Sequence, residues 1–158
     1  MTDFVRLLRV LHVGRVDCIV VGGLAATIHG SARLTQDVDV CYSRAPDNLE
    51  RLVGALRPLK PYLRGAPAGL PFEWSVATLR SGLNFTLTTT AGSLDLLGDV
   101  AGGGDYDALL PHTVIASLFG YDVKCLDLEW LIRTKRAAGR PRDLEAIAEL
   151  EALREERA

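Results

Sequence analysis

The stretch VGGLAATIHGSARLTQDVDV, residues 21–40, contains the features that decide the fold. Its last part places Asp37 and Asp39 among apolar residues, a pattern that is typical of a β-strand. Because alternate residues of a strand share a face, the two carboxylates point the same way, about 7 Å apart along the chain. Like charges that are partly removed from water need a positive partner. The sequence therefore predicts a strand that carries an anionic site.

A glycine pair precedes this strand. The apolar run CIVVG (18–22) predicts a short strand. Gly22-Gly23 then form the turn that leads from this strand to a brief helix, which ends near Gly30. Glycine lets the backbone approach a phosphate closely, and the first turn of a helix offers free N–H groups. We therefore expect the glycine pair to hold phosphate. Ser31 and Arg33 follow, and each either contacts the phosphate or simply ends the helix and faces solvent.

The composition is that of an ordinary globular domain. The chain has 158 residues, 48% of them hydrophobic and 24% charged, with a formal net charge of −2, so no global basic field attracts nucleic acid or a membrane. Three cysteines (Cys18, Cys41, Cys125) lack metal-ligand spacing, which predicts free thiols in a reducing cytosol. Neither a membrane span nor a signal-peptide layout is present in the sequence, so we expect a cytoplasmic location.

Outward from residues 21–40, the chain alternates between helical and strand patterns. Thr2 is the expected N-cap of a first helix, and a proline at position 46 opens an amphipathic one. The remaining expected elements are a short strand around Tyr62, a short helix from Ser75 to Arg80, strands 83–90 and 93–100 joined by a turn at Ala91-Gly92, strands 112–119 and 121–126 joined at Gly120, a helix from Asp127 to Ala138, and a last helix from Pro141. We predict one α/β domain over residues 1–158, with C-terminal helices from about residue 127.

The order and spacing of the opening motifs resemble a known family. Val21-Gly22-Gly23 are followed by thirteen residues and then by Asp37-Val38-Asp39, which is similar to the signature of the nucleotidyltransferase superfamily that includes DNA polymerase β. The resemblance implies an α/β (α+β) palm-like fold, a mixed β-sheet flanked by helices on one side. It also implies that the two aspartates bind Mg²⁺ or Mn²⁺ and that a nucleoside triphosphate (NTP) is the substrate, since Mg²⁺ favours a few carboxylates together with phosphate oxygens.

A third carboxylate is expected on a neighbouring strand, because phosphoryl transfer of this kind needs a base near the attacking hydroxyl. Asp95 fits, since it lies opposite Leu94 and Leu96 in a strand that is otherwise poor in polar groups. Asp99 is the competitor, although it follows Gly98 and has the features of a turn residue. We therefore predict that Asp37, Asp39 and Asp95 are catalytic residues and metal ligands.

The C-terminal segment adds a candidate cation. The apolar stripe Leu128, Leu131, Ile132 continues to Lys135, which indicates an ammonium that either reaches back to solvent or points into a cleft. The segment LIRTKRAAGRPRDLEAI also resembles bacterial superfamily members related to abortive-infection toxins, and Lys135 and Asp143 match the residues that this group carries. An acidic residue near a helix start also favours the helix dipole, and we prefer that interpretation for Asp143.

The hypothesis is an enzyme that moves a nucleoside monophosphate from NTP to a hydroxyl of an acceptor, which is tRNA, a protein or a small molecule. Gly22, Gly23, Ser31, Arg33 and Lys135 would bind the nucleotide. The resemblance to the toxins adds a role in a toxin–antitoxin pair, with an antitoxin as partner. The alternative is a catalytically degenerate module that binds a nucleotide or a partner protein without turnover.

Overall fold

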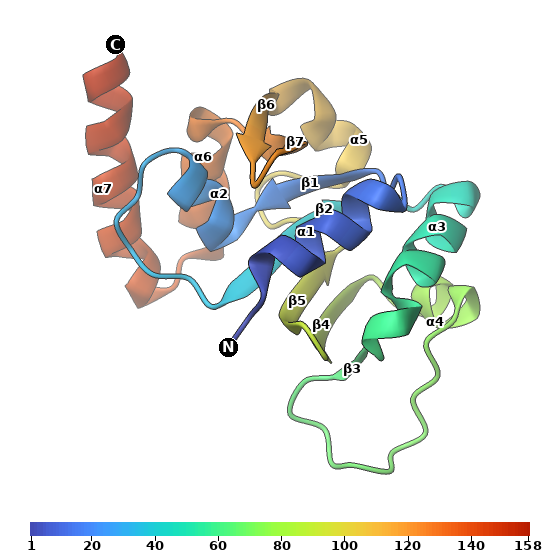
Figure 1. The fold of residues 1–158 in the computed structure, drawn as a ribbon. Helices are drawn as coiled ribbons and strands as arrows, with labels where there is room; N and C mark the ends of the chain where they lie inside the picture. Colours follow the sequence, from blue (N-terminus) through green and yellow to red (C-terminus); the bar gives the residue numbers. More distant parts are fainter.

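The computed structural model describes all 158 residues, and a mixed sheet runs through it (Figure 1). The seven strands are β1 (Cys18–Val21), β2 (Asp37–Tyr42), β3 (Tyr62–Leu63), β4 (Asn84–Thr89), β5 (Gly92–Leu97), β6 (Thr113–Leu118) and β7 (Tyr121–Leu126). They lie in the order β3-β4-β5-β2-β1-β7-β6. The seven α-helices are α1 (Phe4–Val13), α2 (Gly22–Ile28), α3 (Pro46–Leu56), α4 (Val76–Ser81), α5 (Tyr106–Leu109), α6 (Leu128–Ala138) and α7 (Pro141–Arg157).

The sheet combines parallel and antiparallel pairs. β1 runs antiparallel to β2, whereas β2 runs parallel to β5 and β1 runs parallel to β7. β4 with β5 and β6 with β7 form antiparallel hairpins, as the turn residues predicted. Asp39 of β2 is opposite Val21 of β1 on one side and opposite Asp95 of β5 on the other. This register brings the distant parts of the site together at the centre of the sheet.

Helices cover both faces of the sheet. Val20 lines a cavity with Leu8 of α1, whereas the next residue, Val21, lines a different cavity with Leu131 of α6. Since successive strand residues point to opposite faces, α1 and α6 lie on opposite sides. In Figure 1, α3 packs beside α1 in front of the sheet. The expectation of helices on one side was therefore wrong, because the apolar side chains of β1 on the second face need a cover of their own.

Capping residues and glycines in the sequence correctly predicted most of the element boundaries. Asp127 caps α6 by accepting a hydrogen bond from the backbone of Trp130, and Gly139, with φ +65°, ends that helix. The predicted cap of α1 was wrong, because Asp3 and not Thr2 accepts the hydrogen bond from Arg6. The Thr2 hydroxyl instead donates to the carbonyl of Gln36 and so ties the N-terminus to the segment before β2.

Two further features concern the cysteines and the length and polarity of the helices. All three cysteines are free, as their spacing predicted. None of the helices is both long enough and apolar enough to cross a bilayer.

Candidate active site

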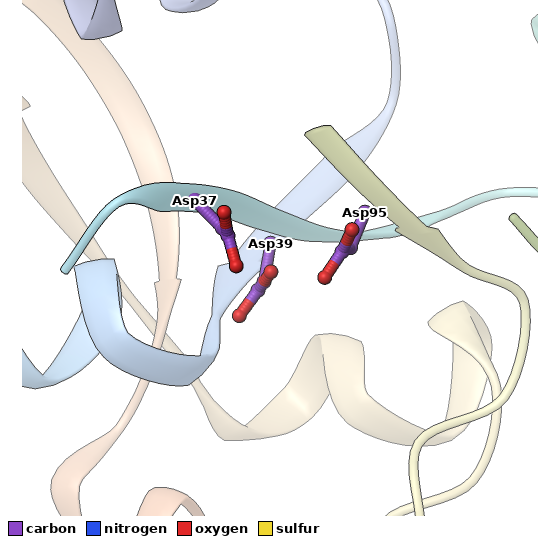
Figure 2. A group of neighbouring side chains, drawn as sticks. All are labelled: Asp37, Asp39 and Asp95. Carbon is purple, nitrogen blue, oxygen red and sulfur yellow. The ribbon is translucent and has the colours of Figure 1, made fainter. Parts of the chain in front are cut away.

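Three carboxylates gather on one face at the centre of the sheet. Alternation along β2 puts Asp37 and Asp39 on the same face, and the parallel pairing of β2 with β5 puts Asp95 directly beside Asp39. One carboxylate oxygen from each residue lies within 4.8 Å of the other two. Figure 2 shows the three side chains projecting to the same side of their strands. The structure thus brings together all three of the predicted carboxylates.

The environment of Asp39 opposes a negative charge. Burial raises the pKa of the Asp39 carboxyl to about 7, and the neighbouring carboxylate of Asp95 and that of Asp37 add to the effect, while Lys135 opposes it. Oδ1 of Asp39 is buried and has no hydrogen-bond partner, and the same is true of Oδ1 of Asp95. A cluster of three acidic groups, in which a buried oxygen of Asp39 has neither a hydrogen bond nor an ion pair, calls for a further cation.

A divalent metal ion fits this donor set. Carboxylate oxygens are the hard ligands that Mg²⁺ and Mn²⁺ take, and Mg²⁺ sites use only a few of them beside phosphate and water. Oδ1 of Asp39 would gain the partner that the protein does not supply, and Oδ1 of Asp95, which has only the guanidinium of Arg64 beside it, would gain a ligand bond. The residues present therefore suit a metal held by Asp37, Asp39 and Asp95.

The absence of side chains at Gly22 and Gly23 leaves space for Asp39 and Thr35. Gly22 has φ +64°, and a Cβ atom there would lie 2.2 Å from Oδ2 of Asp39. A Cβ atom at Gly23 would lie 2.7 Å from the hydroxyl oxygen of Thr35. The sequence pointed to phosphate as the group that approaches these glycines. The structure shows that the nearest groups are two side chains from the segment that leads into β2 and from β2 itself.

A polar cavity of about 440 Å³ opens beside the carboxylates, toward the start of α7. Asp37, Asp39 and Asp95 line it together with four cationic residues, which are Arg33, Lys135, Arg140 and Arg142. Lys135 is half-buried, and burial lowers the pKa of its ammonium while Asp143 counteracts that effect. The predicted cation on the apolar stripe of α6 thus lies at the cleft, next to the acidic cluster.

A second cavity, of about 390 Å³, adjoins the first. Asp39, Asp95, Lys135 and Arg140 line both cavities, whereas Asp37 lines only the first. Its other walls combine apolar residues, such as Leu131 from α6 and Leu97 from β5, with polar ones. Asp99, the competitor of Asp95, lines this second cavity and is not part of the three-carboxylate group.

Two other candidates face different partners. The Ser31 hydroxyl donates to Oε1 of Glu149 on α7, and Ser31 lines neither cavity beside the carboxylates. The structure therefore does not bring Ser31 to the site, because α7 uses its hydroxyl. Asp143 accepts hydrogen bonds from the backbone N–H and from Nε of Arg140, which together cap the start of α7. This agrees with the helix-start interpretation of Asp143.

Three cationic residues at the site were not predicted. Arg140 and Arg142 flank Pro141 in the segment GRPRD, and this concentration of arginines near Lys135 was the signal that could have identified them. Arg64 forms an ion pair with Asp95, in which Nη2 lies 2.8 Å from Oδ1. No local pattern marks Arg64, since it lies in a loop rich in proline and glycine and reaches the site only through the pairing of β3, β4 and β5.

Comparisons with known proteins point to one fold. No protein-family model matches the sequence, and no curated protein matches it either. The lincosamide antibiotic adenylyltransferase LnuA, with lincomycin bound, superposes with a TM-score of 0.61 at 13% identity over 96% of each chain. TM1012 from Thermotoga maritima, assigned as a nucleotidyltransferase, gives a TM-score of 0.59 at 14% identity over 94% of each chain. ANT(2″)-Ia in complex with adenylyl-2″-tobramycin gives 0.58 at 14% identity, over 94% of this chain and 91% of that one.

These similarities extend over nearly the whole chain, and they agree with the sequence resemblance in the glycine turn and the Asp-x-Asp strand. The chain has the nucleotidyltransferase fold.

Proposed function

We propose that this protein transfers a nucleoside monophosphate from an NTP to a hydroxyl group of an acceptor, with Asp37, Asp39 and Asp95 holding Mg²⁺ or Mn²⁺. The observation that carries the proposal is the acidic cluster itself. Its three carboxylate oxygens lie within 4.8 Å of one another, two buried oxygens of the cluster accept no hydrogen bond, and a cationic cavity lies next to them. A structural acidic cluster would not need the cationic wall.

The two cavities suggest how the substrates divide. The polar cavity offers Lys135, Arg140 and the other arginines to the triphosphate, because phosphate oxygens are strong acceptors for these donors. The second cavity, which has fewer cationic residues, is left for the acceptor, with Asp95 at the border between the two.

In the reaction, the acceptor oxygen forms a bond to the α-phosphorus and the bond from that phosphorus to pyrophosphate breaks. Asp95 takes the proton of the attacking hydroxyl, as general bases do in such displacements. A metal ion held by Asp37, Asp39 and Asp95 would neutralise the charge that builds up on the phosphate oxygens.

The neighbours bear on the class of acceptor. LnuA is an adenylyltransferase seen with lincomycin, and ANT(2″)-Ia is seen with adenylyl-2″-tobramycin. Among tRNA, protein and small molecules, these neighbours favour a small molecule for this chain too. A cytoplasmic location and a toxin–antitoxin pairing stay predictions of the sequence. The complete set of carboxylates argues against the degenerate binding module, since a protein that only binds nucleotide has no need of the third.

The test is release of pyrophosphate from each of the four NTPs in the presence of Mg²⁺ and a panel of hydroxyl compounds that includes lincomycin, tobramycin and tRNA. Asp37→Asn and Asp39→Asn should abolish turnover. Their melting temperatures should be unchanged or higher, because each substitution removes a charge from a repulsive cluster. Asp122→Asn is the matched control, because Asp122 is exposed and lines the cavity on the opposite face.

Two results would contradict the proposal. Metal-dependent NTP binding without pyrophosphate release for every compound would favour the degenerate binding module. A large drop in the melting temperature of both variants would instead indicate that the two aspartates are structural.

A further inference from the structure

Arg64 belongs to the same row of residues as the carboxylates. Its backbone N–H donates to the carbonyl of Thr86 in β4, which extends the β3–β4 pairing by one residue. Thr86 is opposite Asp95, and Asp95 is opposite Asp39. Residues in one register row point to the same face of a sheet. Arg64 can therefore reach over the small side chain of Thr86 to the acidic cluster, two strands away.

The contact that Arg64 makes with Asp95 is one of charge and not a directed hydrogen bond. Nη2 of Arg64 lies 2.8 Å from Oδ1 of Asp95, but it donates its hydrogen bond to the carbonyl of Leu87 at 2.6 Å. Nε of Arg64 and Oδ1 of Asp95 are both buried and both lack a hydrogen-bond partner. The guanidinium thus supplies positive charge to the cluster without satisfying its oxygens.

Arg64 differs in this respect from the other cations of the site. No ion pair joins Lys135, Arg140 or Arg33 to any of the three carboxylates, since Arg140 pairs with Asp143 and Arg33 pairs with Glu145. Arg64 lines neither of the two cavities beside the cluster. Its charge is therefore directed at the carboxylates and not at the space where a substrate would lie.

We propose that Arg64 stands in for part of the charge of the divalent metal in the nucleotide-free protein, and so makes tight metal binding depend on nucleotide. A divalent ion that binds Oδ1 of Asp95 comes close to the guanidinium, and the two cations repel each other. The phosphates of a bound nucleotide compensate this repulsion and add ligands to the metal. This inference rests on the proposed function only in taking the three carboxylates as a metal site.

The experiment measures Mn²⁺ binding to the full chain without nucleotide, by electron paramagnetic resonance and calorimetry. Arg64→Met removes the charge and keeps an unbranched aliphatic stem, and it should bind Mn²⁺ at least tenfold more tightly than the wild type. Arg64→Gln should do the same, and it serves as a second uncharged variant if the Met variant does not fold. Arg64→Lys keeps the charge and should retain the weak binding of the wild type.

Arg80→Met is the control for the change in net charge, since Arg80 is exposed on α4 and forms no ion pair. It should bind Mn²⁺ as the wild type does. An ATP analogue that cannot be cleaved should increase Mn²⁺ affinity strongly in the wild type and much less in Arg64→Met. Mn²⁺ affinities of Arg64→Met and Arg64→Gln that equal or fall below the wild-type value would overturn the inference.

The outcome is separable from that of the proposed function. Tighter Mn²⁺ binding by Arg64→Met supports the role of Arg64 even if no acceptor leads to release of pyrophosphate. Pyrophosphate release by the wild type, combined with unchanged Mn²⁺ affinity in Arg64→Met, removes the role of Arg64 and leaves the proposed reaction in place.

Discussion

Gly22 is the position where the backbone and the acidic cluster touch. A side chain there would have to adopt φ +64° and would collide with the carboxylate of Asp39. We expect Gly22→Ala to lower the free energy of unfolding by about 1–2 kcal/mol from the left-handed backbone alone. It should also weaken Mn²⁺ binding, because the Asp39 carboxylate must move.

Chemical denaturation and metal titration check this prediction. Gly54→Ala is the control, because Gly54 lies in α3 with open space around it, and alanine should stabilise a helix there by about 0.4–1 kcal/mol. Equal effects of the two substitutions would mean that the contact between Gly22 and Asp39 has no energetic consequence.

Asp39 also makes the stability of the metal-free protein depend on pH. Its pKa is about 7 in the folded chain, while an unfolded aspartate titrates near its ordinary value of about 4. Between these values the folded state binds more protons than the unfolded state, so the stabilising contribution is complete below pH ~4 and is lost as the pH rises through 7. We expect the wild type in EDTA to lose stability relative to Asp39→Asn across this window. Urea denaturation of both proteins from pH 4.5 to 8 measures the difference, and parallel curves would contradict the assignment.

Helix and turn boundaries could be predicted because their signals are local. Ser75 caps α4 and Asp127 caps α6 through hydrogen bonds within three residues, and Gly139 ends α6 in the left-handed region. The exception is Thr2, whose hydroxyl bonds to Gln36, 34 residues away. Whether Thr2 or Asp3 caps α1 depends on this distant contact, which cannot be predicted from the local sequence.

The apolar stripe of α6 predicts that the ammonium of Lys135 points into the cleft, and substitutions of Lys135 test this. If its half-buried ammonium meets a phosphate in the polar cavity, Lys135→Ala should weaken NTP binding by about 1.5–3 kcal/mol, roughly tenfold to a hundredfold. Lys135→Arg should restore part of this, since a planar guanidinium does not replace a compact point charge. Calorimetry with NTP and Mg²⁺ measures both.

Arg136→Ala is the control for Lys135, because Arg136 faces outward and pairs with Glu151 of α7. Loss of that exposed pair should cost at most about 1 kcal/mol of stability and leave NTP binding unchanged. Similar losses of NTP affinity in the two alanine variants would show that the stripe does not direct Lys135 to the cleft.

The sequence predicted which residues form the acidic cluster but not everything that surrounds it. Asp37 and Asp39 share a strand, so alternation alone places them together, and Asp95 was found through its strand pattern. Arg64 lies next to Asp95 only because β3, β4 and β5 pair in one register. The cover on both faces of the sheet likewise depends on strand order, which arises from packing between distant segments.

The two sides of the cleft also come from different parts of the chain. The carboxylates lie on central strands of the sheet, while Lys135, Arg140 and Arg142 lie on or beside α6 and α7, in the last quarter of the sequence. Helix α7 packs against α6, and two of its side chains bind other parts of the chain. Glu149 accepts a hydrogen bond from Ser31, and Arg157 donates one to the backbone carbonyl of His29. A nucleotide that spans the cleft would therefore connect α7 to the sheet.

Such a connection should suppress the local opening by which α7 exchanges its amide hydrogens with solvent. In hydrogen–deuterium exchange, NTP with Mg²⁺ should slow deuterium uptake along residues 141–157, including turns of the helix that touch no ligand. The edge strand β6, on the far side of the sheet order, should exchange at the same rate with and without nucleotide. If protection were confined to residues 140–143, α7 would not open as a unit, and the last helix would move independently of the contents of the cleft.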